Sequence, residues 1–379
     1  MEVPTVRGPL KIETIPRMFR SAAEKYPDNP ALLMERDGVR QEYTYRELLQ
    51  RIESLARSLR KQGFSPEDKV GLIGENCPDW ETSYLAIQWA GCIAVPLDKM
   101  LKVAEIRHIL RSSDSVGVIS TESYTEIVAE AISEINRKFK KIAIGNTPRG
   151  WLSYEALITE GTDMKPIKPP KDIEKLAAIL YTSGTTGQAK GVMLTHKNIG
   201  SNISGGYQSL DFDPDDVFIS ILPLHHSFEA TAGFLTPLCC GSRIVFSPSL
   251  KSRDILDTMS KNGATIMLGV PLLFEKIVQG VQRQVKDSSA FKRFIFNAGM
   301  NIGKIAKGIS KAMFKSVRQA MGMDKVRYLI SGAAALAPWA SSFMERLGLP
   351  VLQGYGLTET SPIVSVNRLK NPDNESVGH

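Results

Sequence analysis

The sequence lacks the features that mark membrane-spanning and secreted proteins. No uninterrupted apolar run reaches the ~18–20 residues that a membrane-spanning helix needs, and residues 1–8 contain no apolar signal-peptide core. The few cysteines show no metal-ligand spacing; they are Cys77, Cys92, Cys239 and Cys240. We therefore expect buried thiols in a reducing compartment and a cytoplasmic location, which allows peripheral contact with the inner face of a membrane.

Two catalytic motifs are also missing. The Walker A pattern G-x-x-x-x-G-K-[ST] does not occur, because Lys190 comes three residues after Gly187 and Gly191 follows it. The G-x-S-x-G turn that presents a nucleophilic serine in many hydrolases is absent as well. These absences disfavour a P-loop kinase and a Ser-His-Asp hydrolase.

Acidic residues are absent from the segment 288–323, which holds seven basic residues. Without these seven, the 47 basic and 40 acidic side chains of the chain balance, so the net charge of +7 is a local property. If 292–318 is helical, its basic side chains could lie on an anionic membrane or could simply face solvent. Nucleic acid is not expected as a partner, because the usual aromatic platforms are not interleaved with the charges. One predicted stripe holds Lys304, Lys307, Lys311, Lys315 and Arg318, and another holds Ile305, Ile309, Met313 and Val317.

Predicted strands and helices alternate along most of the 379 residues, which suffice for a large core and more than one subdomain. We expect an α/β fold of two doubly wound subdomains, approximately 1–170 and 171–379, with a smaller β-rich part and a cleft between the halves. The Pro/Lys-rich connector 165–171 sets that division. The predicted strands are 69–73, 91–95, 115–119, 141–144, 176–180, 217–222, 243–246, 265–269 and 326–330, and the predicted helices are 44–63, 79–90, 104–110, 249–262 and 340–347.

The most informative stretch follows the predicted strand 176–180. Residues 181–192 read Tyr-Thr-Ser-Gly-Thr-Thr-Gly-Gln-Ala-Lys-Gly-Val, so glycines, hydroxyls and a lysine follow a buried strand. Glycines let backbone N–H groups face an anion, hydroxyls donate hydrogen bonds, and lysine adds a positive charge. The stretch therefore predicts a loop that binds a polyphosphate, and Thr195 or Asn198 is expected to cap the next helix.

Three further loops after predicted strands carry unusual residues. Residues 353–362 read Gln-Gly-Tyr-Gly-Leu-Thr-Glu-Thr-Ser-Pro, where glycines flank a tyrosine and Glu359 offers an oxygen ligand suited to Mg²⁺. Residues 331–338 are small and follow a strand, and residues 222–229 contain two adjacent histidines. Because ligands bind beyond the carboxyl ends of strands in such sheets, we expect one composite site.

The order and spacing of residues 182–191 resemble the signature loop of the acyl-adenylate-forming superfamily, which includes acyl-CoA synthetases, luciferases and peptide-synthetase adenylation domains. The resemblance implies that this loop holds the β- and γ-phosphates of ATP, that 331–334 forms an adenine wall, and that 353–359 contacts adenine, α-phosphate and magnesium. The implied nucleotide-binding residues are Thr182, Ser183, Gly184, Thr185, Thr186, Gly187, Lys190, Gly332, Ala333, Ala334, Gln353, Gly354, Tyr355 and Thr358, with Thr182 and Glu359 at the metal. The implied catalytic residues are Lys190, Thr358, Glu359 and His226, and the implied substrate contacts are His226, Phe228 and Gly233.

The resemblance covers most of the chain, and 270–277 with the basic segment looks most like long-chain fatty acid–CoA ligases. It implies ATP- and Mg²⁺-dependent activation of a fatty acid to acyl-AMP, followed by transfer to CoA. An aryl- or amino-acid-adenylating enzyme and a non-catalytic nucleotide- or acyl-binding module stay open as alternatives. The family's ribose-binding Thr-Gly-Asp motif and its small C-terminal domain have no counterpart here, so we expect 1–379 to be the large N-terminal domain, poorly active alone. Acyl chain length and oligomeric state are not predicted.

Overall fold

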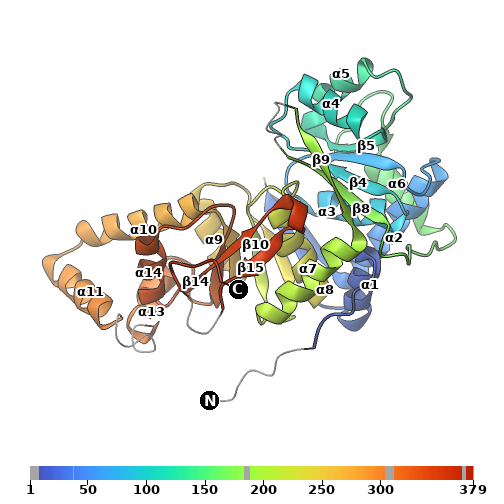
Figure 1. The fold of residues 1–379 in the computed structure, drawn as a ribbon. Coiled ribbons are helices and arrows are strands. Elements are labelled where there is room, and N and C mark those ends of the chain that lie inside the picture. The colour runs from blue at the N-terminus through green and yellow to red at the C-terminus, as the bar shows by residue number, and fades with distance from the viewer. Residues whose placement is uncertain (1–7, 37, 183–187, 304–310, 369–372, 379) are drawn as a thin grey trace.

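The computed structural model describes residues 8–36, 38–182, 188–303, 311–368 and 373–378. Its strands form two sheets, each parallel in its centre and antiparallel at one or both edges (Figure 1). Two doubly wound sheets confirm the α/β prediction. Within the described residues, no helix is both long enough and apolar enough to span a bilayer.

The first sheet has the strand order β7-β6-β5-β3-β4-β8-β9. Its neighbours are parallel except β8 and β9, which form an antiparallel hairpin. The strands are β3 (Lys69–Ile73), β4 (Ile93–Pro96), β5 (Ser115–Thr121), β6 (Lys140–Ile144), β7 (Leu152–Ser153), β8 (Leu176–Thr182) and β9 (Lys190–Thr195). The helices of the N-terminal part are α1 (Ile15–Lys25), α2 (Tyr45–Lys61), α3 (Pro78–Trp89), α4 (Val103–Ser112), the 3-10 turn η1 (Glu122–Tyr124), α5 (Thr125–Ser133) and α6 (Tyr154–Thr162).

The second sheet has the strand order β15-β14-β13-β12-β10-β11-β1-β2, with antiparallel pairing only at its two edges. Its strands are β1 (Pro30–Arg36), β2 (Val39–Thr44), β10 (Val217–Ser220), β11 (Arg243–Phe246), β12 (Ile266–Gly269), β13 (Tyr328–Ser331), β14 (Val351–Gly356) and β15 (Ile363–Val366). The helices of the C-terminal part are α7 (His196–Ser209), the π-helix η2 (Glu229–Leu235), α8 (Thr236–Cys240), α9 (Ser252–Asn262), α10 (Pro271–Lys286), α11 (Ala290–Ile302), α13 (Lys315–Ala320), α14 (Pro338–Arg346) and the 3-10 turn η3 (Thr358–Thr360).

The strands do not divide between the sheets at residue 170. β1 and β2 precede that point but lie in the second sheet, where β1 pairs with β11. β8 and β9 follow it but lie in the first sheet, where β8 pairs with β4. The connector 165–171 is therefore not a boundary between two separately formed sheets.

Local signals in the sequence set several helix starts. Thr44 accepts a hydrogen bond from Glu47 N, and the Glu47 side chain bonds back to Thr44 N, which is the predicted capping box of α2. Thr195 and Asn198 form the same reciprocal pair at the start of α7. Such caps satisfy backbone groups that the first helical turn leaves unpaired. The π-helix η2 lies outside the predicted elements, because π-helices are rare and short.

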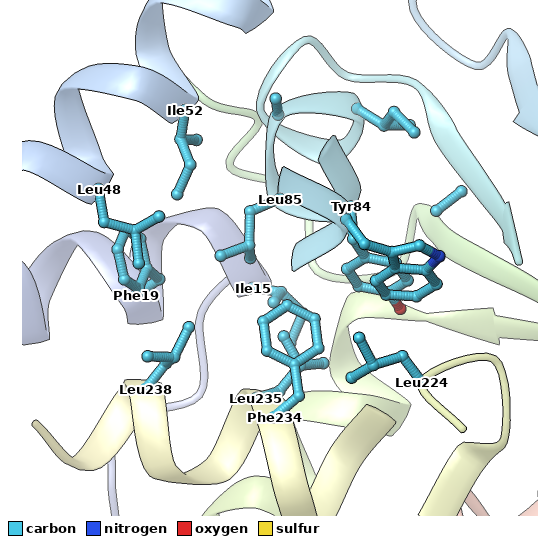
Figure 2. Close-up of a cluster of buried hydrophobic side chains, with 14 of the residues drawn as sticks. Ile15, Phe19, Leu48, Ile52, Tyr84, Leu85, Leu224, Phe234, Leu235 and Leu238 are labelled. Atoms are coloured by element: carbon cyan, nitrogen blue, oxygen red, sulfur yellow. The ribbon is translucent and has the colours of Figure 1, made fainter. Parts of the chain in front are cut away.

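A buried cluster joins elements that pack on both sheets (Figure 2). Helix α3 contributes Tyr84 and Leu85, while η2 contributes Phe234 with its ring edge-on to Tyr84 at 5.6 Å. Fully burying one such side chain contributes about 1.5–3 kcal/mol. The cluster also contains Ile15, Phe19, Leu48, Ile52, Leu224, Leu235 and Leu238. This shared core fixes the two sheets against each other.

The segment 292–318 does not form one continuous helix, which was the condition for the two predicted stripes. Helix α11 ends at Ile302, and Phe314 has a non-helical backbone at the start of α13. Arg318 does not belong to an exposed stripe either, because it is buried and its Nη1 donates to Leu347 O at 2.8 Å. Lys304, Lys307, Ile305 and Ile309 lie outside the described residues.

Candidate active site

A cavity of about 480 Å³ lies beyond the carboxyl ends of β10, β12 and β13 and beside β14. Three of the loops that the sequence placed in one composite site line it, each after a different strand. Val270, which follows β12, completes this part of the wall. Most of the lining is apolar. Seven predicted site residues line the cavity, namely His226, Phe228, Gly332, Ala333, Gly354, Tyr355 and Thr358.

The strand order explains why the cavity forms at this place. After β10 the chain adds β11 on one side and then crosses over to add β12 on the other, so the end of β10 is a topological switch point. The first sheet has its own switch point at β3, because β4 and β5 flank that strand. Helices leave such a point in opposite directions and leave a crevice between the loops.

Asn76, which follows β3, ties these two switch points together. Its Nδ2 donates to Leu222 O at 2.7 Å and to Ser220 Oγ at 3.1 Å, and its Oδ1 accepts from Leu224 N at 3.3 Å. One side chain of the first sheet thus holds the start of the segment that follows β10, residues 221–228, which we call the β10 loop. Asn76 was not among the predicted site residues.

The β10 loop carries the predicted substrate contacts. His226 is exposed on the cavity wall, and Phe228 is half-buried. The His225 ring lies 4.1 Å from the His226 ring, and Asp98 Oδ2 lies 3.5 Å from His225 Nε2. Burial lowers the pKa of His225 to about 4. Partial removal of the His226 ring from water lowers the pKa of His226 as well, so both rings are neutral at pH 7.

Gly233 does not line the cavity. It is buried in η2, where an added Cβ would lie 2.5 Å from Glu229 Oε2. Glu229 is on the cavity wall instead, with Oε1 accepting from Ser220 Oγ at 2.9 Å. The sequence signal that could have identified Glu229 is an acidic residue directly before the uncharged, largely apolar run 230–240. A carboxyl that is buried with such a run needs a reason.

Glu229 has a second buried carboxyl as a neighbour, that of Glu81 in α3. Neither Glu81 oxygen nor Glu229 Oε2 has a hydrogen-bond partner among the described residues. Burial raises the pKa of Glu229 to about 8, and burial together with the nearby Glu229 raises the pKa of Glu81 well above its ordinary value. Both carboxyls are therefore neutral at pH 7, because two unpaired buried charges would be too costly.

The loop after β13, residues 332–337, forms the wall opposite the β10 loop; we call it the β13 loop. An added Cβ at Gly332 would lie 2.9 Å from two ring carbons of Phe228, so the two loops touch where a glycine is required. Ala333 has a φ of 71°, a left-handed conformation that costs energy for alanine and is concentrated at functional sites. Ala334 is exposed and is not part of the cavity lining.

Gln353 is buried and holds the wall from behind. Its Oε1 accepts from Leu336 N at 3.0 Å, and its Nε2 donates to Asn374 O at 3.0 Å. The side chain thus connects β14 to the β13 loop. Its interactions are those of a residue that positions the site.

The stretch from Tyr355 to Thr360 closes the cavity on a third side. Tyr355 is half exposed, so its ring can present a face to a ligand. Thr358 Oγ1 lies 3.2 Å from Ser227 Oγ, which joins this stretch to the β10 loop. Asn202 of α7 fixes the turn, donating to Thr360 O at 3.0 Å and accepting from Ile363 N at 2.6 Å.

The predicted phosphate loop connects β8 to β9. Thr182 and Lys190 are paired across this hairpin, so the segment starts and ends at one point, and Lys190 is the first residue of β9. His108 Nε2 lies 3.0 Å from Ala189 O and holds the hairpin to α4. β9 also contacts η3, so the hairpin lies beside the turn that carries Glu359. Ser183, Gly184, Thr185, Thr186 and Gly187 lie outside the described residues.

The side chains at this edge fit a nucleotide with a divalent cation. The side chains of Lys190 and Glu359 are both exposed, and neither side chain is joined by a hydrogen bond or ion pair to another described residue. Mg²⁺ is usually held by one or two carboxylates together with substrate phosphates. Within the described part of the chain, no group of three or more His, Cys, Asp or Glu residues could hold a metal by itself. Glu359 is therefore suited to a cation that arrives with a polyphosphate.

Comparison with known proteins agrees with this geometry. The family model for AMP-binding enzymes matches residues 19–379. The chain belongs to this family of AMP-binding enzymes. This confirms the family that the phosphate-loop motif indicated.

Relatives of this AMP-binding enzyme include acyl-CoA synthetases. Peroxisomal long chain acyl-CoA synthetase 7 of Arabidopsis thaliana is 30% identical over 395 residues, covering 97% of this chain and 55% of the relative. Long chain acyl-CoA synthetase 4 of the same organism is 32% identical over 384 residues, covering 90% and 56%. The chain thus spans about half the length of the curated relatives it matches.

A solved structure shows the same fold. The crystal structure of the anthranilate CoA ligase AuaEII in complex with anthranoyl-AMP superimposes with a TM-score of 0.79 and 20% sequence identity, covering 97% of this chain and 65% of that one. At that identity the likeness confirms the fold class and says nothing about the substrate.

Proposed function

We propose that this AMP-binding enzyme activates a fatty acid with ATP and passes the acyl group to CoA. A carboxylate oxygen attacks the α-phosphorus of ATP, the bond to the bridging oxygen breaks, and pyrophosphate leaves. The CoA sulfur then attacks the acyl carbonyl, the thiol loses its proton, and AMP leaves. The observation that supports this best is an apolar cavity between the β10 and β13 loops, close to the Lys190 and Glu359 side chains, which have no ion-pair partner among the described residues.

The residues of the chain divide the work by their positions. Tyr355 and the β13 loop would bind the adenine, Thr358 the α-phosphate, and Lys190 the outer phosphates. Neutral His226 would contact the reacting carboxylate with a ring N–H. Bound Mg²⁺, held by Glu359 with Thr182 nearby, would supply further neutralisation of phosphate charge. Alignment of two reactants and neutralisation of phosphate charge are the main contributions of a protein to such a step.

The cavity favours an alkyl chain over an amino acid. An amino acid would need an anionic partner for its ammonium group. The only carboxyl among the described lining residues is Glu229, which is neutral at pH 7. The names of the relatives also support a long-chain acid. A cytoplasmic location stays a prediction.

The test is the binding of stable acyl-AMP mimics to the chain, measured by calorimetry. We expect the affinity of acyl-sulfamoyl adenosines to rise from octanoyl to palmitoyl, because each CH₂ that enters an apolar pocket tightens binding by up to about fourfold. Anthraniloyl- and leucyl-sulfamoyl adenosine serve as aryl and amino-acid comparisons. Tighter binding of either of these than of every alkyl mimic would refute the fatty acid assignment, and equal affinity for all would show that the acyl group does not enter the cavity.

A further inference from the structure

Helix α11 presents an apolar face to solvent. Phe291 is 73% exposed, Phe294 71% and Ile295 48%, and Ile302 at the end of the helix is 40% exposed. The last three residues follow Phe291 by 3, 4 and 11 positions, so all four lie on one side of an α-helix. Single exposed apolar residues are ordinary, but two phenylalanines at this exposure on one face need a reason.

The opposite side of α11 is packed, so the apolar face cannot turn inward. The Phe296 ring lies 5.2 Å from Phe314 and 6.2 Å from Phe343. Gly299 is buried under the Phe314 ring, where an added Cβ would lie 2.8 Å from a ring carbon. The helix is therefore fixed with Phe291, Phe294 and Ile295 pointing away from the protein.

Positive charge surrounds this face. Lys292 is exposed beside this face on α11, and Lys286 is exposed at the end of α10. Lys311 and Lys315 are exposed in the next described segment. No acidic residue occurs between Asp287 and Asp324. An apolar face with aromatic residues and a basic surround is typical of a helix that lies in the headgroup region of a membrane.

The helix lies at one extremity of the molecule (Figure 1). Val270, which precedes α10, lines the cavity, and the 16 residues of α10 then lead away from it. A straight helix of that length spans about 24 Å. The position therefore argues against an acyl tunnel that opens at α11.

We propose that α11 docks this protein on an anionic lipid bilayer, with Phe291, Phe294 and Ile295 inserted among the headgroups and with Lys292, at the edge of this face, on anionic lipid. A second copy of the chain fits this face less well, because a symmetric contact would bring the basic residues of both copies together. Each basic residue near an anionic surface strengthens binding by roughly fivefold, and the apolar side chains add binding that salt does not screen. The proposal does not depend on the reaction, since docking requires no substrate.

The experiment is co-sedimentation of the chain with vesicles of phosphatidylcholine alone or with 30 mol% phosphatidylglycerol. The charge variant Lys292→Gln should bind the anionic vesicles roughly fivefold more weakly. The apolar variant Phe291→Ala/Phe294→Ala/Ile295→Ala should lose the binding that persists at 1 M salt. Matched controls are Lys165→Gln/Lys171→Gln and Val39→Ala/Met100→Ala, which change exposed residues elsewhere and should bind like the parent.

Insertion is tested separately with Phe294→Trp, whose emission should shift to the blue and be quenched by brominated lipid, while Met100→Trp should show neither change. Circular dichroism of every variant checks that the fold is kept. Equal sedimentation with both lipids, variants that bind like their controls, or an unquenched Trp at 294 would overturn the proposal. A concentration-dependent dimer that the apolar variant abolishes, without vesicle binding by the parent, would assign the face to a second copy instead.

Discussion

Replacing Glu229 by glutamine should change how stability depends on pH. The folded protein keeps Glu229 protonated up to a pKa of about 8, whereas in the unfolded chain the carboxyl ionises near its ordinary value of 4.5. Between these values the folded state holds one more proton than the unfolded state. The contribution of Glu229 to the unfolding free energy is fully present below pH 4.5. It is lost progressively as pH rises towards 8, by about 1.4 kcal/mol per pH unit for one proton.

Glu229→Gln removes this loss without removing the hydrogen bond, because an amide oxygen can still accept from Ser220 Oγ. The unfolding free energy of the variant minus that of the parent should therefore rise by about 1.4 kcal/mol per pH unit from pH 5 to pH 8 and then level off. Over the whole interval between the two pKa values, 4.5 and about 8, the gain is on the order of 5 kcal/mol. Glu81 is present in both proteins and acts in the same direction, so both should lose stability as pH rises, the parent more steeply because it also has Glu229.

The assay is urea unfolding of both proteins at half-unit steps from pH 5 to pH 9, followed by circular dichroism. Glu130→Gln, at an exposed position, controls for the loss of one carboxyl from the chain. A difference between Glu229→Gln and the parent that stays constant over this range would refute the reasoning, because it would mean that Glu229 ionises alike in the folded and unfolded states.

Three further predictions concern the site. Lys190→Ala and Glu359→Gln should each weaken Mg-ATP binding in calorimetry by on the order of 2–4 kcal/mol, and unchanged affinity in both would remove them from the nucleotide site. Asn76→Ala should lower the unfolding free energy by about 1–3 kcal/mol and weaken palmitoyl-sulfamoyl adenosine more than ATP, because it leaves buried groups of the β10 loop unpaired; a loss of stability with unaltered ligand affinities would make it a purely structural residue. Gly332→Ala should displace the Phe228 ring at a cost of about 1–3 kcal/mol and weaken the same acyl ligand, and full affinity in this variant would show that the two loops can separate freely.

The sequence predicted the regular elements well where local chemistry determines them. The capping residues Thr44 and Thr195 predict the starts of α2 and α7. In each case the threonine side chain accepts a hydrogen bond from the backbone N–H three residues later, an interaction typical of a helix start. Buried apolar strands such as β3 and β11 stand out as short apolar runs for the same local reason. The alternation of these elements then implies parallel sheets, because parallel strands need crossover connections.

The pairing of strands could not be predicted, because it depends on contacts between distant segments. β1 and β2 are missing from the predicted strands, and nothing local shows that β1 will pair with β11. For a related reason, the sequence did not show that 292–318 would not form one continuous helix. Its periodicity did not reveal that Arg318 would be buried or that the chain would break at Phe314.

The candidate site was predicted through residues that form motifs, and it was missed where a role comes only from position. The tyrosine between two glycines and the lysine after the glycine-rich loop stand out in the sequence. Asn76 acts by hydrogen bonds to two backbone groups of the β10 loop, which is distant in sequence. Glu229 is notable only because it is buried. Gly233 was assigned to the acyl pocket and instead makes room for the Glu229 carboxyl.

The exchange of strands between the sheets has a consequence for how the chain is made. β1 pairs with β11 through Leu32 and Ile244, which are separated by roughly 200 residues. At synthesis rates of about 5–20 residues per second, β1 emerges from the ribosome some tens of seconds before its partner exists. During that interval β1 lacks its β11 partner, and an isolated β1–β2 hairpin would be only marginally stable and open to other strands at both edges. The first sheet likewise stays incomplete until β8 has been made. The unpaired edges of both sheets therefore persist on the nascent chain until strands from the other half have been made.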